Sequence, residues 1–183
     1  MPSVSPSMLL SLNFHWVDAQ LAVGGSWPIE AVELLARRER IRAIVDLRAE
    51  DCDDERTLRR YGIELLHLPT TDGEAISLAM IDEGVSWVRE RLDRGDRLLI
   101  HCQAGVGRSA LLAMCIQVAG GAEPLEALVR IKAARRVVGP SPAQLEMYRV
   151  WVEKYGARVD RQLEIPSLEA LGRVAYPADD YSR

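Results

Sequence analysis

Residues 98–109 read Leu-Leu-Ile-His-Cys-Gln-Ala-Gly-Val-Gly-Arg-Ser, and this stretch predicts a strand, a tight loop and a helix in direct succession. Three aliphatic residues lead into His101 and Cys102, and an apolar helix is expected from Ser109 onward. Such a loop can direct several backbone N–H groups toward one anion, with the helix N-terminus behind them. That positive field favours the thiolate form of Cys102. Arg108 adds a planar fork of donors that matches phosphate oxygens.

The stretch from His101 to Ser109 resembles the His-Cys-x-x-x-x-x-Arg-Ser/Thr signature of cysteine-dependent phosphatases, in particular the dual-specificity (tyrosine/serine/threonine) type. The resemblance implies that Cys102 attacks phosphorus and forms a phosphocysteine intermediate, while Arg108 binds the phosphate. His101 would orient the loop, and Ser109 would ease breakdown of the intermediate. The P-loop residues implied to hold the phosphate are Gln103, Ala104, Gly105, Val106 and Gly107. For His101 the alternative is a satisfied core histidine, and for Ser109 a helix N-terminal hydroxyl.

Asp72 is the candidate general acid and base. Cleavage of a phosphate ester needs a carboxylic acid that protonates the leaving oxygen and then activates water. Asp72 lies in the loop Pro-Thr-Thr-Asp-Gly, thirty residues before Cys102, which resembles the placement of the acid in dual-specificity phosphatases. The Trp-Pro-Asp loop typical of tyrosine-specific members is missing. A turn role before Gly73 is the alternative, and Asp46 resembles a structural residue of the family.

The order of the expected elements along the sequence predicts an α/β fold, because strand patterns alternate with helix patterns. We expect a mostly parallel central sheet with helices on both faces. The strands are expected at residues 13–23, 42–47, 63–68 and 97–100. Three parts are predicted, a loose N-terminal segment (1–12), a catalytic domain to which the resemblance applies (13–156), and a weakly patterned C-terminal tail (157–183). The charged segment 48–60 is expected to form a short surface helix with a solvated face.

Several further residues admit two interpretations. Cys52 could form a reversible disulfide with Cys102 that protects the thiolate from oxidation. Gln144 could position a hydrolytic water, or it could close a capping box with Ser141. The basic stretch 130–136 could meet a phosphorylated substrate, although a solvated helix end is the favoured interpretation.

Composition restricts the class of protein. The 183 residues are 48% hydrophobic and 27% charged, as expected of one soluble globular domain. A net charge of −4 argues against a nucleic-acid binder. Three cysteines without a disulfide spacing favour a reducing compartment, so a cytoplasmic location is expected. Neither a signal peptide nor a membrane span is predicted. We expect no metal or other cofactor, since the three histidines share no ligand spacing.

The sequence therefore predicts a phosphatase that hydrolyses phosphate monoesters on tyrosine and/or serine/threonine residues of proteins. Its partners would be a phosphorylated protein or a small phosphomonoester, and the loop without lysine favours singly phosphorylated esters. Alternatives are a phosphoinositide or other non-protein phosphatase of the same superfamily, a rhodanese-type sulfur transferase, and a non-catalytic phosphate-binding module. The sequence does not indicate an oligomeric state.

Overall fold

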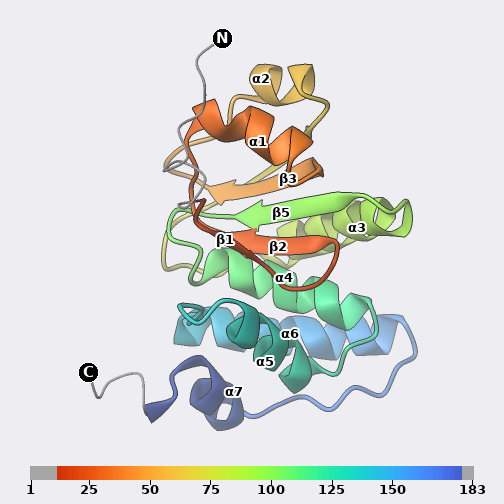
Figure 1. Cartoon of the computed structure of the whole chain (residues 1–183). Helices are drawn as coiled ribbons and strands as arrows, with labels where there is room; N and C mark the ends of the chain where they lie inside the picture. The colour runs from red at the N-terminus through yellow and green to blue at the C-terminus, as the bar shows by residue number, and fades with distance from the viewer. Residues whose placement is uncertain (1–11, 179–183) are drawn as a thin grey trace.

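The strands of the sheet follow the order β1-β2-β5-β3-β4 in the computed structural model, which describes residues 12–178 (Figure 1). They are β1 (Phe14–Trp16), β2 (Leu21–Gly24), β3 (Ile41–Arg48), β4 (Glu64–Thr70) and β5 (Arg97–His101). All neighbours are parallel except β1 and β2, so the prediction of a mostly parallel sheet is confirmed. The carboxyl end of the central strand β5 lies where open α/β sheets bind ligands.

Helices cover both faces of this sheet, as predicted (Figure 1). They are the 3₁₀ turn η2 (Ile29–Ala31), α1 (Val32–Arg37), α2 (Glu55–Arg60), α3 (Leu78–Asp93), α4 (Arg108–Ala119), α5 (Pro124–Ala134), α6 (Pro142–Arg158) and α7 (Leu168–Ala175). One core cluster joins α1 to Ile44 and Leu99, and the other joins α3 and α4 to the opposite face of the sheet. Helix α4 is buried almost all round, which explains its nearly uniform apolar sequence.

The expected strand over 13–23 is wrong, because the chain reverses at Asp18. The carboxylate of Asp18 accepts hydrogen bonds from the backbone N–H groups of Gln20 and Leu21, both at 2.8 Å. This arrangement is an Asx turn, in which a side chain replaces a backbone acceptor. Two antiparallel strands result, β1 and β2, and His15 of β1 pairs with Val23 of β2.

Strand β4 continues past the expected end at Leu68, through Pro69 to Thr70. Proline is tolerated there because β4 lies at the edge of the sheet, where one side of the strand needs no backbone donors. The strand thus ends two residues before Asp72.

Within residues 157–178 the chain forms helix α7. Ser167 caps this helix by accepting a hydrogen bond from the N–H of Ala170 at 3.1 Å, and Leu171 and Ala175 are buried in the larger core cluster. Two buried positions four residues apart suffice for one short helix face, but they leave only a weak pattern in the sequence. The predicted loose segment 1–12 lies almost entirely outside the described residues, as do residues 179–183.

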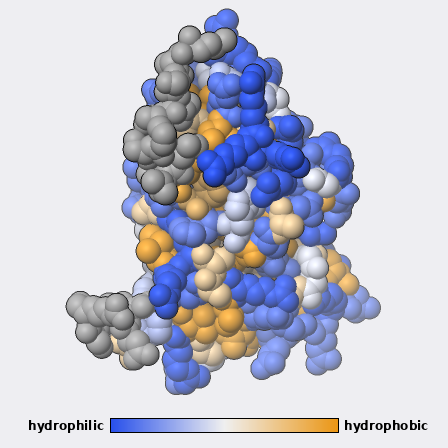
Figure 2. Space-filling view, viewed as in Figure 1, coloured by the Kyte–Doolittle hydropathy of each residue, from blue (hydrophilic) through white to orange (hydrophobic). Residues whose placement is uncertain are grey.

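The surface seen in Figure 2 is largely hydrophilic, with apolar side chains gathered over α5 and α7 in the lower part of the view. Within residues 12–178, no helix combines the length and the apolar content needed to cross a membrane.

Candidate active site

The loop between β5 and α4 has four successive carbonyl groups held from outside. Gln103 O accepts from the N–H of Ser26 at 2.9 Å, and Val106 O accepts from the N–H of Gly139 at 3.0 Å. Arg135 donates to the two carbonyls between them, at 2.9 Å for Ala104 and 2.7 Å for Gly105. The carbonyl and N–H of a trans peptide point in opposite directions, and the described residues contain no cis peptide. The N–H groups of residues 104–107 therefore face the interior of the loop.

Cys102 lies at the start of this loop and is 2% exposed. Its Sγ accepts a hydrogen bond from the N–H of Gly105 at 3.3 Å and lies 3.5 Å from Oγ of Ser109. Gly105 is required here, because its φ is +70° and an added Cβ would lie 2.3 Å from the carbonyl carbon of Gly24. The Gly105 N–H therefore points its positive end at the sulfur.

Arg108 begins α4 with its side chain fully buried. Nη1 donates to the carbonyl of Thr70 at 2.6 Å, and Nη1 and Nη2 donate to the two carboxylate oxygens of Glu50 at 2.9 and 2.7 Å. Nη2 also lies 2.9 Å from a carboxylate oxygen of Asp72. Within the described part of the chain, Nε is buried without a hydrogen-bond partner. An unpaired buried donor of a charged group is costly, and a phosphate oxygen would satisfy it.

Glu50 is a site residue that the sequence analysis missed. The guanidinium of Arg108 holds the pKa of Glu50 at about 2, so the carboxylate is ionised near neutral pH. Its two oxygens accept hydrogen bonds from both Nη groups of Arg108. Nothing in the charged segment 48–60 distinguishes this glutamate from its acidic neighbours.

Removing the charge of Glu50 is expected to strengthen phosphate binding. In Glu50→Gln, inorganic phosphate no longer competes with a carboxylate for Arg108, so its inhibition constant should fall about three- to tenfold. Competitive inhibition of p-nitrophenyl phosphate hydrolysis measures this constant. Asp51→Asn is the matched control, because Asp51 carries a neighbouring charge but pairs with Arg48 instead. Weaker phosphate binding in Glu50→Gln would contradict the expectation.

Asp72 lies at the same site, with a side chain that is 74% exposed. Its loop is fastened to the start of α6, where Ser141 Oγ donates to the carbonyl of Gly73 at 3.1 Å and Gln144 Nε2 donates to that of Glu74 at 2.9 Å. Gln144 Oε1 accepts from the N–H of Ser141, which completes the capping box. Both ends of the Gln144 amide are thus engaged in structural contacts, which supports the capping interpretation.

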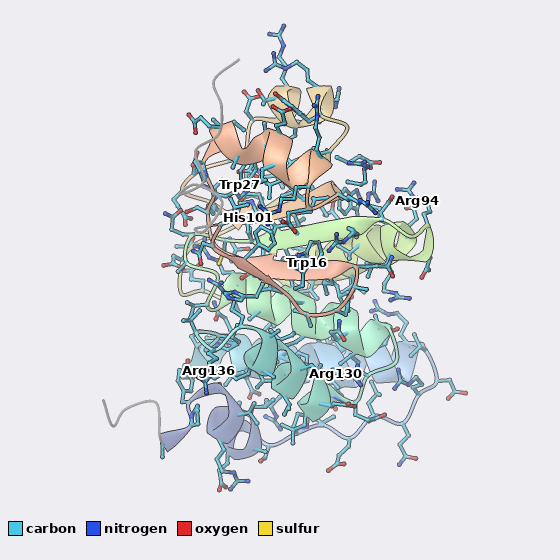
Figure 3. All side chains as sticks on the ribbon, in the orientation of Figure 1. Trp16, Trp27, Arg94, His101, Arg130 and Arg136 are labelled. Carbon is cyan, nitrogen blue, oxygen red and sulfur yellow. The ribbon has the colours of Figure 1, made fainter. Side chains whose placement is uncertain are left out.

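His101 is fully buried behind the loop. Its Nε2 lies 2.9 Å from a carboxylate oxygen of Asp53. Figure 3 shows Trp27 beside His101, and the centroids of the two rings are 6.4 Å apart.

The expectation of a solvated face for 48–60 is wrong at Arg48, which is buried and paired with Asp46 and Asp53 at 2.8 and 2.7 Å. The charged residues fold inward because each finds an opposite charge, which lowers the cost of burial.

Asp46 belongs to this buried network. Burial alone would raise the pKa of its carboxyl group, but hydrogen bonds from Arg48, together with electrostatic attraction to His101 and Arg48, outweigh burial and lower it. Asp46, Asp53 and His101 place possible ligand atoms within 4.8 Å of one another, as a metal site would. The guanidinium of Arg48 donates to both carboxylates, so this cluster is already held together by an arginine.

The basic stretch 130–136 divides into exposed and buried parts. Arg130 and Arg136, labelled in Figure 3, are exposed as expected. For Arg135 the expectation of a solvated helix end is wrong, because it is 2% exposed and contacts the loop. Only the tertiary arrangement distinguishes the two adjacent arginines.

Cys52 is exposed and Cys115 is buried, and both are free thiols, as is Cys102. Burial and the charges of Asp46 and Asp53 raise the pKa of Cys52, which lowers its thiolate fraction. Its Sγ donates to the carbonyl of Asp53 at 3.5 Å. A reversible disulfide between Cys52 and Cys102 stays a prediction.

The chain is similar in sequence and in fold to known phosphatases. Residues 24–122 match the family described as "Polymorphic toxin system, DSP-PTPase phosphatase". The protein of Rattus norvegicus named phosphatidylglycerophosphatase and protein-tyrosine phosphatase 1 is 27% identical, and the match covers 79% of each chain. The solved structure of Tk-PTP in its active form is similar with a TM-score of 0.71 and 25% identity, covering 78% of this chain and 98% of that chain. Human DUSP28 shares the fold, with a TM-score of 0.70, 20% identity, and coverage of 79% and 96%.

Proposed function

Because this chain belongs to the DSP-PTPase phosphatase family of polymorphic toxin systems, and is thus a cysteine-dependent phosphatase, we propose that Cys102 is its nucleophile. The thiolate attacks phosphorus, and the bond between phosphorus and the ester oxygen breaks. Asp72 gives its proton to the departing oxygen. A water molecule, deprotonated by Asp72, then attacks the phosphocysteine, which releases phosphate and returns the thiolate. No redox step or metal is required.

The observation that carries this proposal is the convergence of donors on one spot. The N–H groups of residues 104–107 point into the loop, that of Gly105 donates to the Cys102 sulfur, and the unpaired Nε of Arg108 is buried at the same site. Three phosphoryl oxygens could be held by such an arrangement while charge develops in the transition state. The Ser109 hydroxyl, 3.5 Å from Sγ, would donate to sulfur as the phosphocysteine breaks down.

For the substrate we propose a singly phosphorylated ester, on phosphotyrosine and/or phosphoserine/threonine of a protein. The carboxylates of Glu50 and Asp72 both contact Arg108, and they would repel further phosphate groups on the same substrate. A phospholipid headgroup is the second candidate, favoured by the name of the rat relative, which joins phosphatidylglycerophosphatase and protein-tyrosine phosphatase activities. The three free thiols support a cytoplasmic location as part of the proposal.

A first experiment measures p-nitrophenyl phosphate hydrolysis by freshly reduced protein with EDTA present. Turnover that survives EDTA supports the proposed chemistry, and its absence would contradict it. A second measurement compares phosphotyrosyl and phosphoseryl peptides with phosphatidylglycerophosphate in mixed micelles. A higher kcat/KM for the lipid would replace the protein substrate by the second candidate.

The role of Asp72 as acid predicts a dependence on the leaving group. In Asp72→Asn, kcat/KM for phenyl phosphate should fall about 10²- to 10³-fold, since phenolate leaves poorly without a proton. The loss should be clearly smaller for p-nitrophenyl phosphate, whose leaving group needs protonation less. Asp93→Asn, at an exposed ion pair with Arg89, is the control and should match the wild type. Equal losses for both esters would argue against an acid role.

A further inference from the structure

Arg135, just after α5, holds two consecutive carbonyl groups of the Cys102 loop. Its Nη2 donates to Ala104 O at 2.9 Å, and its Nε donates to Gly105 O at 2.7 Å. The residue is only 2% exposed. It also lies beyond residues 24–122, the part of the chain that matches the family. The family match therefore covers the loop but not Arg135.

One peptide group joins Arg135 to the sulfur. Ala104 O and the N–H of Gly105 belong to the same peptide group, and that N–H donates to Cys102 Sγ at 3.3 Å. A cation bound at the oxygen end polarises the group and strengthens the hydrogen bond that its N–H donates. The next peptide group has the same orientation, because Arg135 holds Gly105 O and the N–H of Val106 points the other way.

The partners of Arg135 carry no negative charge. Nη2, which holds Ala104 O, also donates to Asn13 Oδ1 at 2.7 Å, and Nη1 lies 3.0 Å from His15 Nδ1. Burial and the charge of Arg135 lower the pKa of His15, so its neutral ring accepts this hydrogen bond. The other arginines buried among residues 12–178 all contact a carboxylate, and these are Arg48, Arg91 and Arg108.

A buried cation without a carboxylate is costly unless another anion lies near it. Burial lowers the pKa of Arg135, whereas the charge of Cys102 acts in the opposite direction. The Cys102 sulfur, which the peptide group between Ala104 and Gly105 links to Arg135, is placed to offset this charge when it is ionised. This explains how a buried arginine is retained beside neutral partners.

We propose that Arg135 is a positioning residue for the phosphatase reaction, acting through the peptide groups that it holds. It fixes two N–H groups toward Cys102 and adds positive charge that stabilises the thiolate and the bound phosphate. Asn13 and His15 of the β1 region keep the guanidinium in place. The inference rests on the proposed role of Cys102 as the nucleophile.

The test compares Arg135→Lys and Arg135→Gln with Arg136→Gln, a change at the adjacent exposed arginine. Circular dichroism establishes which variants are folded. In folded Arg135 variants, kcat/KM for p-nitrophenyl phosphate should fall about 10- to 100-fold, as for the loss of aligned oxyanion donors. The control should stay within about twofold of the wild type, as a surface change does.

Alkylation of Cys102 by iodoacetamide supplies a readout that a merely structural role would not move. The pH of half-maximal alkylation rate should rise by about one unit in Arg135→Gln. In Arg135→Lys this pH should rise less, because lysine keeps the positive charge but lacks the planar guanidinium that donates to two carbonyls at once. Inorganic phosphate should also inhibit both variants less strongly than the wild type. Folded Arg135 variants with an unchanged alkylation profile and unchanged kcat/KM would overturn the inference.

Should both Arg135 variants unfold, the double variant Asn13→Ala/His15→Ala decides the question, since it frees the guanidinium without removing it. It should lose about three- to tenfold in kcat/KM and shift the alkylation profile in the same direction. A folded double variant with wild-type values would overturn the inference. A failure of the proposed function gives a different result from a failure of this inference. If Cys102 is not the nucleophile, Cys102→Ser retains turnover, whereas the Arg135 variants still alter the alkylation of Cys102.

Discussion

Replacing Cys102 with serine is expected to remove phosphatase activity, with a loss of about 10⁴-fold or more in kcat. The hydroxyl of serine ionises far less readily than a thiol, and the loop donors that favour a thiolate do not make it a comparable nucleophile. Stability should change little, because serine is of similar size and the donors Gly105 N–H and Ser109 Oγ stay within reach. The measurement is the rate of phosphate release from p-nitrophenyl phosphate.

Two controls separate loss of the nucleophile from loss of the site. Cys52→Ser changes an exposed thiol and should leave kcat unaltered. Cys102→Ser should still bind inorganic phosphate within a few-fold of wild-type affinity by calorimetry, because the loop N–H groups and Arg108 are unchanged. Wild-type turnover in Cys102→Ser would refute the proposed mechanism. A thiol-independent rate would then have to come from another group.

Arg108→Lys is the second change with a large expected effect, a loss of about 10³-fold in kcat/KM. Lysine keeps one positive charge beside Glu50 and Asp72, so the two carboxylates are not left facing each other. It lacks the rigid fork, and its single ammonium cannot replace both Nη groups and the unpaired Nε. The loss should therefore occur in a folded protein, which thermal unfolding checks.

The matched control is Arg59→Lys, the same substitution at an exposed ion pair with Glu55. It should change neither kcat/KM nor the unfolding temperature measurably, as expected for surface pairs. Activity of Arg108→Lys within threefold of the wild type would show that the guanidinium does not bind the transferring phosphoryl group. Arg108 would then serve mainly to bind Glu50 and Thr70.

Local sequence signals are sufficient to predict the elements on which the site depends. The aliphatic run before His101 predicts β5, the two glycines predict the loop, and the apolar run after Ser109 predicts α4. These are local signals, because periodicity and glycine content act within a few residues. The same holds for the capping box of Ser141 and Gln144, which the structure confirms.

Which charged residues face inward depends instead on tertiary contacts. Glu50, Asp53 and Arg135 lie in segments whose composition predicts a solvated surface, yet all three contact the site. Arg135 and Arg136 have no local feature that distinguishes them, and one is buried while the other is exposed. The physical reason is that a charge becomes buried only where distant parts of the chain supply its partners. For Arg135 those partners come from the loop after β5 and from Asn13 and His15, more than a hundred residues earlier in the sequence.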